Sequence, residues 1–450
     1  MFYLSKVDDS QLEAQPSTGT MVTVTVASWL GTLVDYYDFF LAGFVAGSVW
    51  PALFFPAGNA AIATAVSISV YATTYIIRPI GAFMFGHIGD KHGRRGSLMW
   101  TLILAGAGMV GIALTPSYAS IGYLAPALVT VFRLIFGIGI GVEWGGAMAW
   151  VGEYAAKSKW RPFWMCWIQS AVPGGRVVAG IAVAGVASAL SSASYISYGW
   201  RTLFLAGAAV LVVAVVMRYK LAESPLFTAL AQRKEIEKSP AMTVLKRYWR
   251  RILLLACATN FHISVPTIAI MPYTIIYALD LAQARNAPGI TNTMISLAIG
   301  VGTIPFIVGQ VIGGLAGSII GRRKTFMISA VVSLVLELVY FPLINTLNIW
   351  NIFLAAALLQ LALGPGSGVG GAFLNEHFET KYRYSGAGLC YQIAGLIGGV
   401  TGGIILPIVI LAAPNAVSVW PYVTALAMAV TLITIVGLIF TKETKGLEFK

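Results

Sequence analysis

The chain has few charged residues and few cysteines for its length. Charged side chains make up only 10% of its 450 residues, against 58% apolar residues. A water-soluble fold cannot bury that much apolar surface, so a soluble globular protein is excluded. The three cysteines, Cys166, Cys257 and Cys390, fall inside apolar runs far apart in the sequence. This spacing predicts neither a disulfide framework nor a metal site.

Two further patterns are missing. Residues 1–21 contain Asp8, Asp9 and Glu13 and lack a short apolar core followed by a cleavage site, so they predict a flexible tail and not a signal peptide. The sequence also lacks a glycine-rich loop followed by Lys and Ser or Thr, so ATP is not expected to act on it directly. We expect no cofactor and no enzymatic activity.

Long apolar windows dominate what is present. Runs of about 20 residues, the length at which a helix spans a bilayer, recur between Val24 and Phe440 with short polar breaks. They predict an all-α integral membrane protein with twelve transmembrane helices. The predicted spans are 24–50, 60–86, 97–115, 121–150, 162–190, 200–220, 251–279, 290–317, 325–344, 349–374, 384–412 and 417–440.

The 29 lysines and arginines are distributed asymmetrically. Three (Arg78, Arg133 and Arg176) lie inside predicted spans and two (Arg201 and Arg285) lie on one side, while the rest fall in the tails and alternate loops. Because cytoplasmic loops hold the excess of positive charge, both termini are predicted to be cytoplasmic. The net charge of +12 then reflects this topology and contact with anionic lipids, and not a nucleic-acid partner.

The sequence contains an internal duplication. GHIGDKHGRR at 86–95 is echoed by GLAGSIIGRR at 314–323, and Lys159-Trp-Arg161 is echoed by Lys381-Tyr-Arg383. One long polar stretch separates the halves, which are predicted to be parallel repeats. The predicted regions are a cytoplasmic tail at 1–23, an amino-terminal six-helix bundle at 24–221, a cytoplasmic linker at 222–250, a carboxy-terminal six-helix bundle at 251–440, and a cytoplasmic tail at 441–450.

Seven motifs, in order, resemble those of the major facilitator superfamily, and within it the metabolite:proton symporter family. They are GTLVDYYDFFLAG at 31–43, RPIGAFMFGHIGDKHGRR at 78–95, RLIFGIGIGVEWGG at 133–146, GEYA at 152–155, GWR at 199–201, ESPLF at 223–227 and KYRYSGAGLCYQ at 381–392. The resemblance covers about Gly31 to Gly446. It implies a secondary transporter in which the first, fourth and fifth helices line a central cavity. Members of that family carry organic acids and zwitterions such as 2-oxoglutarate, citrate, shikimate, proline and betaine.

The loop after the second span is a candidate gate. Gly86 and Gly89 allow the span to end close to a neighbouring helix, and Asp90 is placed to pair with Arg94 or to cap the next helix. Arg94 and Arg95 are expected to face the anionic leaflet. The resemblance implies that this loop latches a cytoplasmic gate. The alternative is a plain topological anchor of positive charge.

The second copy of this loop departs from the first. It keeps Gly321, Arg322 and Arg323, but Ser318 stands where the first copy has its aspartate. We therefore expect a weaker or absent latch in the second half. Glu143, near the inner end of the fourth span, is expected to pack at the gate.

Charged residues inside the spans are the strongest candidates for a functional site, because each costs about 2.5 to 3.5 kcal/mol on insertion scales. Asp35 and Asp38 lie three residues apart on one side of the first span. Neighbouring carboxylates disfavour simultaneous ionisation, which suits proton binding and release. Arg133 and Arg176, midway along the fourth and fifth spans, offer planar donors for a carboxylate. All four are expected near one depth.

These charged residues are given two predicted roles. Proton coupling is predicted at Asp35, Asp38 and Arg133, and substrate binding is predicted at Arg133 and Arg176. The alternative is that the aspartates form static ion pairs with Arg133.

Four polar residues complete the predicted substrate site: Gln169 in the fifth span, Asn260 in the seventh, and Tyr391 and Gln392 in the eleventh. Tyr391 and Gln392 have a second interpretation, since polar side chains in membranes often bridge helices.

Two ionisable residues are left outside the predicted site. A single histidine in an apolar helix more often packs than carries a proton, so His262 is expected to pack. Glu337, alone in the ninth span, is expected to face lipid or a peripheral partner.

Taken together, the sequence predicts a monomeric, multi-pass transporter of the plasma membrane whose partners are a small-molecule substrate, a proton and the lipid bilayer. The first hypothesis is proton-coupled symport of a small organic acid or zwitterion by alternating access. A proton-coupled or facilitative sugar porter is the second, and KETKG at 442–446 favours it. A non-transporting membrane sensor on the same scaffold is the third.

Overall fold

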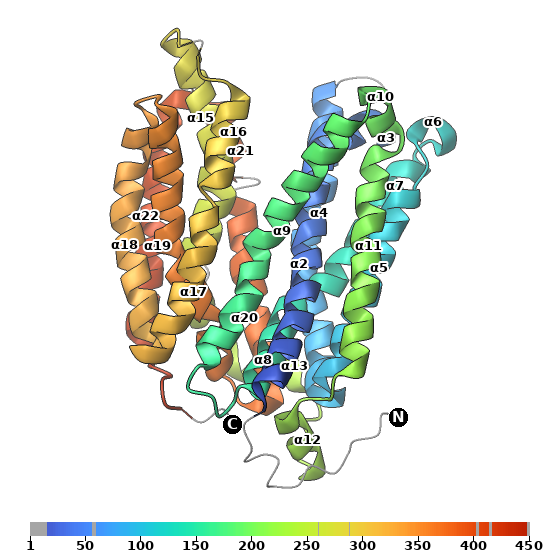
Figure 1. Ribbon diagram of the computed structural model, residues 1–450, viewed down its shortest axis with the longest axis vertical. Coiled ribbons are helices and arrows are strands. Elements are labelled where there is room, and N and C mark those ends of the chain that lie inside the picture. Colours follow the sequence, from blue (N-terminus) through green and yellow to red (C-terminus); the bar gives the residue numbers. More distant parts are fainter. Residues whose placement is uncertain are drawn as a thin grey trace.

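The computed structural model describes residues 16–55, 60–259, 261–287, 289–401, 405–413 and 416–447. These residues form helices and loops, and no strand occurs among them, so the predicted all-α class is confirmed. The helices stand side by side in two groups (Figure 1), and α2 begins at the same end of the molecule at which α22 ends.

The first group of helices comes from the amino-terminal half. Gly93, with a φ of 113°, ends one long helix and starts the next, a conformation that glycine adopts without strain. The helices are α2 (Thr18–Ser48), α3 (Trp50–Phe54), α4 (Ala60–His92), α5 (Arg94–Leu114), α6 (Tyr118–Ile121), α7 (Leu124–Ile140), α8 (Glu143–Tyr154), α9 (Arg161–Ala189), α10 (Ser192–Ser194) and α11 (Trp200–Lys220), with a π-helical turn at Tyr195–Gly199.

The second group follows a short helix, α12 (Pro225–Gln232), which lies in the predicted linker. A π-helical turn at Pro266–Ile270 interrupts the seventh predicted span, because proline has no backbone N–H to continue the α-helical ladder. The helices are α13 (Pro240–Thr259), α14 (Phe261–Val265), α15 (Met271–Ala284), α16 (Asn292–Val301), α17 (Ile304–Ile319), α18 (Arg322–Ile344), α19 (Ile349–Glu376), α20 (Thr380–Val400), α21 (Leu406–Ala412) and α22 (Trp420–Phe440), with a 3₁₀ turn at Ala416–Val419.

Helices occupy the described parts of all twelve predicted spans, but not all are equally apolar. In the described parts of the chain, nine helices or helix runs are long and apolar enough to cross a membrane. The predicted spans 24–50, 251–279 and 384–412 are not among them. The first of these contains the buried Asp35 and Asp38, and the π-helical turn interrupts the second. Twelve crossings therefore stay a prediction, as do the domain boundaries.

Two hydrophobic clusters hold the helices together. One consists only of residues between Val34 and Ala214, and includes Trp50, Trp200 and Phe204. The other extends from Met21 to Leu438 and draws side chains from both halves. The amino-terminal half thus has a core of its own, whereas the larger core crosses the junction of the halves.

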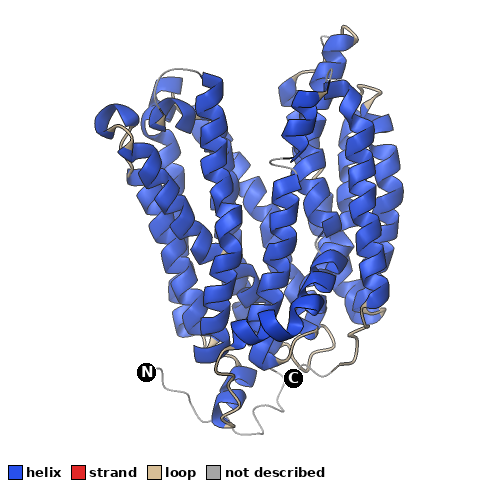
Figure 2. Ribbon diagram, turned by 180° about the vertical axis from the view of Figure 1, so that it is seen from behind, coloured by secondary structure: helices blue, strands red, loops and turns tan. Residues whose placement is uncertain are grey.

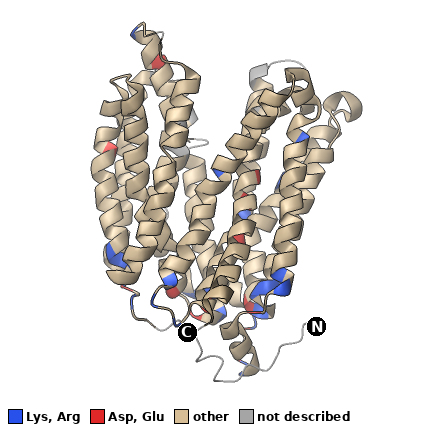
Figure 3. Cartoon of the chain, in the orientation of Figure 1, with Lys and Arg blue, Asp and Glu red and all other residues tan. Residues whose placement is uncertain are grey.

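Helix α9 shows that the halves meet mainly at one end. Its first part, around Cys166 and Gln169, contacts α17 and α19, while Gly180 and Gly185 near its other end have open space beside them. The two groups of helices diverge from this end in both views (Figures 1 and 2). Lysine and arginine also gather at the end where the halves meet (Figure 3).

Candidate functional site

A buried ion pair joins α2 to α7. A carboxylate oxygen of Asp38 lies 2.8 Å from a guanidinium nitrogen of Arg133, and neither side chain is exposed. Arg133 also donates through Nε to the hydroxyl of Thr74 on α4 at 3.1 Å. Among the described residues, the other Asp38 oxygen and Nη2 of Arg133 have no hydrogen-bond partner. The pair balances its charges but keeps capacity for a proton or a further polar group.

A second ion pair lies beside it between α2 and α4. A carboxylate oxygen of Asp35 lies 3.7 Å from Nη2 of Arg78, and both side chains are buried. The Arg78 guanidinium lies 4.7 Å from the centre of the Phe39 ring and 5.6 Å from the ring centres of Tyr36 and Tyr75. The aromatic faces stabilise the cation while leaving its hydrogen-bond donors available.

The four charged residues expected near one depth therefore do not form a single cluster of ion pairs. Arg133 pairs with Asp38 and not with Asp35. Arg176 on α9 is half-buried, its guanidinium lies 5.6 Å from the centre of the Phe40 ring, and no described carboxylate pairs with it. Its donors remain available for another anion.

Tyrosines connect these ion pairs to the other half of the chain. The hydroxyls of Tyr36 on α2 and Tyr391 on α20 lie 2.7 Å apart. The Tyr391 ring stacks on Trp144, with ring centres 3.7 Å apart and planes at 16°. Next to it, the side-chain amide of Gln392 donates to the backbone oxygen of Gly141 at 2.6 Å. Both residues thus bridge the halves in this conformation, as their second interpretation expected.

An amide network continues from this stack. The indole of Trp144 donates to Gln169 at 2.6 Å, and Gln169 donates to the hydroxyl of Ser367 on α19 at 2.9 Å. Gln310 on α17 donates to the same hydroxyl at 3.0 Å. These contacts place Gln169 at the junction of the halves.

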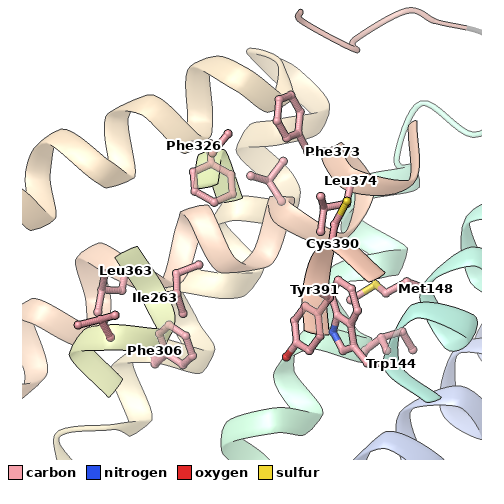
Figure 4. Close-up of a cluster of buried hydrophobic side chains, with 14 of the residues drawn as sticks. Trp144, Met148, Ile263, Phe306, Phe326, Leu363, Phe373, Leu374, Cys390 and Tyr391 are labelled. Atoms are coloured by element: carbon pink, nitrogen blue, oxygen red, sulfur yellow. The ribbon is translucent and has the colours of Figure 1, made fainter. Parts of the chain in front are cut away.

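A small cavity lies at this junction. Its volume is about 10 Å³, close to the minimum that holds one water molecule. Residues from both halves line it, among them Trp144, Tyr391 and Leu374, whose side chains gather in one cluster (Figure 4). A cavity of this volume is too small for an organic solute.

Three polar residues of the carboxy-terminal half remain. Asn260 lies outside the described residues. His262 is fully buried, with its ring centre 5.2 Å from that of Phe326, as packing requires. Of the two alternatives expected for Glu337, lipid or a peripheral partner, the structure shows a partner, because Glu337 is 1% exposed and accepts a hydrogen bond of 2.8 Å from Thr431 on α22. A carboxyl group facing hydrocarbon would have no such donor.

At the cation-rich end, Asp90 joins the two halves directly. Its two carboxylate oxygens accept hydrogen bonds from the backbone N–H groups of Tyr384 (3.2 Å) and Ser385 (2.8 Å) in α20. The Oδ1 oxygen of Asp90 also lies 3.0 Å from Nη1 of Arg94. Asp90 therefore pairs with its arginine and holds the opposite half at once.

Arg94 extends this contact to a second carboxylate. Glu153 lies 3.2 Å from Arg94 and 3.0 Å from Arg383 of the other half, and all three side chains are buried. The expectation that Arg94 faces the lipid leaflet was therefore wrong, because its buried guanidinium pairs with the carboxylates of Asp90 and Glu153. Arg95 is half-buried, with its guanidinium over the Tyr219 ring and bonded to the Tyr219 backbone oxygen.

Two glycines allow this close approach. A Cβ on Gly86 would lie 3.0 Å from the Cα of Ser385, and a Cβ on Gly89 would overlap the ring of Tyr384. Glycine at both positions lets α4 contact α20 through its backbone.

We predict that Gly89→Ala separates the halves at this end. The added methyl group has no space beside Tyr384, and overpacking of this kind costs about 1 to 3 kcal/mol. Cys166 is a native reporter, because it is fully buried against Gly314 of the other half. Its reaction with a thiol reagent added from the cation-rich side should become several-fold faster.

The matched control for this prediction is Gly96→Ala, since no described atom beyond the adjacent residues and backbone of its own helix lies within 4 Å of the position of the new Cβ. Both variants are compared after replacement of Cys257 and Cys390 by alanine. Equal labelling of the Gly89 variant and the control would show that the glycine contact does not keep the halves together.

The second copy of the loop makes a parallel network with different partners. Arg322 lies 2.8 Å from Glu376, and Glu376 lies 2.8 Å from Arg161 of the other half. This repeats the order arginine, glutamate, opposite arginine found around Glu153. The second copy therefore lacks the aspartate contact, in agreement with the expected weaker latch, but it keeps the arginine and glutamate contacts between the halves.

The missing aspartate contact has a backbone explanation. The Ser318 hydroxyl donates to Gly314 of its own helix at 2.8 Å. In the repeat, the position that corresponds to Tyr384 of α20 is Pro162 of α9, which has no N–H to donate. An aspartate at position 318 would lack one of the two donors that Asp90 uses.

A glutamate caps the helix after each copy. Glu223 accepts from the backbone N–H groups of the first two residues of α5, and Glu443 does so at α18. Burial raises the pKa of Glu223. For Glu443 burial also acts to raise the pKa, but backbone N–H groups outweigh it and the pKa lies below its usual range. The side chain of Arg323 donates to the Leu438 backbone oxygen at 2.8 Å.

Among the described residues, the ion-pair and hydrogen-bond partners of Glu143 lie in its own half. Its carboxylate pairs with Arg218 of α11 and accepts a hydrogen bond from Thr101 of α5 at 3.0 Å. These partners all belong to the amino-terminal half, so they give no support to the gating role expected of Glu143.

The network contains several residues for which the sequence predicted no role. Glu153 lies in the motif GEYA and Arg383 in KYRYSGAGLCYQ; in the repeat, Arg161 corresponds to Arg383, and Glu376 lies one position from the counterpart of Glu153. That repetition was the available signal. The remaining residues without an assigned role are Arg78, Trp144, Gln310 and Ser367.

Comparison with known proteins gives matches over nearly the whole chain. The model of the family described as "Sugar (and other) transporter" matches residues 23–251, and that of the "Major Facilitator Superfamily" matches residues 267–450. The inner membrane metabolite transport protein YhjE of Escherichia coli K12 is 32% identical over 388 residues, which cover 83% of this chain and 84% of that one. The proline/betaine transporter of the same organism is 28% identical, with 84% and 75% covered. Its shikimate transporter is 27% identical, with 87% and 90% covered.

Among solved structures, the proton:xylose symporter XylE bound to 6-bromo-6-deoxy-D-glucose superposes with a TM-score of 0.74. The superposition covers 96% of this chain and 98% of that chain at 16% sequence identity. At this level of identity the likeness concerns the fold.

Proposed function

Because the chain belongs to the major facilitator superfamily, we propose that it carries a small organic acid or zwitterion together with a proton by alternating access. It is a multi-pass membrane transporter and not an enzyme. The proton, the substrate class and the residues that serve them are the parts proposed here.

The observation that carries the proposal is the buried pair of Asp38 and Arg133. A proton that binds Asp38 removes the negative charge that holds Arg133, whose guanidinium stays protonated. Arg133 is then free to attract a carboxylate of the substrate. Since an uncompensated charge in this region is costly, the proton and the anion are favoured together and disfavoured singly.

Helix α2, which carries Asp38, also takes part in the contact between the halves. Asp35 and Asp38 both lie on α2, and so does Tyr36, whose hydroxyl meets Tyr391 of α20. A change of charge on α2 therefore acts on a helix that holds the halves together. This supports alternating access coupled to protonation.

Arg176 is the proposed contact for a substrate carboxylate. It lies on α9, its guanidinium has no described carboxylate partner, and it lies over the Phe40 ring. Relatives named for proline, betaine and shikimate indicate solutes that carry a carboxylate. Arginine donors match such a group in a bidentate manner.

We predict that Arg176→Gln raises the KM for transport at least tenfold, while Arg176→Lys retains part of the affinity. The loss reflects one charge-assisted hydrogen bond, worth about 1.5 to 3 kcal/mol. Initial uptake rates over a range of substrate concentrations measure it. An unchanged KM in both variants would remove Arg176 from the substrate site.

A proton-coupled or facilitative sugar porter is the second candidate. It is favoured by the family model over residues 23–251 and by the amides of Gln169 and Gln310 near the junction, since amides suit neutral hydroxylated solutes. Uptake of a hexose that persists after a proton uncoupler would favour facilitative transport over the main proposal.

Solute accumulation in proteoliposomes tests the proposal. Purified protein is given an inward proton gradient and labelled 2-oxoglutarate, citrate, shikimate, proline, betaine or hexoses in turn. Accumulation of a carboxylate or zwitterion that collapses with the gradient supports symport. Entry of solutes without accumulation contradicts the proposed coupling, and no entry of any solute would favour the sensor hypothesis.

A further inference from the structure

An apolar groove opens on the outer side of the carboxy-terminal half. It has a volume of about 340 Å³ and lies between α17 and α18, with α19 at its base. Ile312 of α17, Ile320 directly after α17, and Ile328 and Val332 of α18 form its walls and are exposed. The groove is separate from the ion pairs and from the junction of the halves.

Close packing of α17 against α19, at the base of the groove, explains why the groove exists. Cβ atoms at Gly309 and Gly313 would lie within 3.1 Å of Pro365, so these glycines let α17 lean onto α19. The small side chains of Ala316 and Ala362 then leave space on the side of α18.

The groove has the length of one lipid leaflet. Its residues on α18 run from Thr325 to Leu336, which at 1.5 Å per residue corresponds to about 16 Å. Half of the hydrocarbon core of a bilayer is about 15 Å. The groove begins at the cation-rich end of α18, so it spans the leaflet on that side.

The chemistry of the lining favours a hydrocarbon chain. Among the described residues that line the groove, only Thr325 and Ser329 have hydroxyls. Thr325 donates to the backbone oxygen of Gly321, and Ser329 donates to that of Ala362. Neither hydroxyl proton is left for a ligand. A polar solute would therefore lose its hydrogen bonds to water without replacement.

Cations lie where the groove meets the membrane surface. Lys324 is exposed and precedes Ile328 and Val332 by four and eight residues, so it shares their face of α18. The ammonium of Lys445 lies 2.6 Å from the backbone oxygen of Ile319, at the end of α17. The nearby carboxylate of Glu443 is occupied by backbone N–H groups and so competes weakly for these cations.

We propose that this groove binds one acyl chain of an anionic phospholipid, with its phosphate between Lys324 and Lys445. The acyl chain replaces water and loose lipid along the apolar walls, and the two cations select an anionic headgroup over a zwitterionic one.

Native mass spectrometry of the purified full chain with added phosphatidylglycerol or phosphatidylcholine tests the site. The wild type should retain one phosphatidylglycerol at least about fivefold more than phosphatidylcholine. Joint Lys324→Gln and Lys445→Gln should reduce that ratio to about one, whereas Lys442→Gln, an exposed lysine in the same tail, should leave it unchanged.

Filling the groove tests the acyl chain separately. Ala316→Phe should lose the retained lipid of either kind, while Val335→Phe, on the exposed part of α18 outside the groove, should not. The lysine variants lie at the surface and keep the test valid if Ala316→Phe fails to fold. Equal retention of both lipids by the wild type would overturn the proposal. So would displacement of the lipid by inorganic phosphate alone, which would indicate a simple anion site.

Discussion

Asp38→Asn should abolish proton-driven accumulation while leaving exchange of solute across the membrane. With one proton per solute, a pH gradient of one unit sustains about a tenfold accumulation, since a factor of ten corresponds to 1.4 kcal/mol. Asparagine has nearly the size of aspartate but cannot gain or lose a proton. The accumulation ratio should therefore fall to about one.

Because Asp38 has a buried partner, Asp38→Asn does more than remove one proton-binding carboxylate. Arg133 is fully buried and forms an ion pair with Asp38. Removing one partner of a buried pair costs about 3 to 5 kcal/mol because the other charge remains. Arg133 is then expected to hold a substrate carboxylate persistently, which permits exchange but slows net release.

Glu337→Gln is the matched control for Asp38→Asn. Glu337 is an equally buried carboxyl group, but it bonds to Thr431 between α18 and α22, away from the junction of the halves. It should keep wild-type accumulation. Normal accumulation by the Asp38 variant would remove that residue from the coupling mechanism.

Glu153→Gln should open the cation-rich end of the bundle. Glu153 lies between Arg94 of its own half and Arg383 of the other, all three buried. Glutamine leaves two buried cations without this carboxylate, a penalty of about 3 to 5 kcal/mol in the closed state. Separation of the halves exposes both arginines to water and relieves the penalty, so the equilibrium should shift by a factor of at least about 100.

Labelling of Cys166 measures this opening. In a background without Cys257 and Cys390, a thiol reagent added from the cation-rich side should label Cys166 about 100-fold faster in the Glu153 variant than in the wild type. Glu235→Gln, which removes an exposed carboxylate of the linker, is the control and should leave labelling unchanged. A slow, wild-type labelling rate in the Glu153 variant would mean that the charge network does not hold this end closed.

Helices and duplication were predictable from the sequence because both depend on local pattern. Apolar runs of spanning length specify a helix in a bilayer wherever they occur, and the repeated GRR segments mark the two halves. The same reasoning required Asp38 and Arg133 to find partners, since isolated charges in a membrane are costly. The structure pairs them with each other.

The choice among several possible partners was not predictable, because it depends on how helices rotate and pack. Asp35 pairs with Arg78, which lies on a helix whose position the sequence does not specify. Arg94 appeared lipid-facing because its loop carries positive charge, yet a carboxylate 59 positions away in sequence accepts its hydrogen bond. The choice between lipid and a peripheral partner for Glu337 also depended on this packing, and the structure pairs it with the hydroxyl of Thr431.

The most direct test of the account is the internal pH of liposomes that contain the purified protein, recorded as each solute of the panel is added outside. We predict acidification with one carboxylate or zwitterion in the wild type and none in Asp38→Asn. Entry of the same labelled solute into wild-type liposomes without any change of internal pH would contradict proton coupling through Asp38.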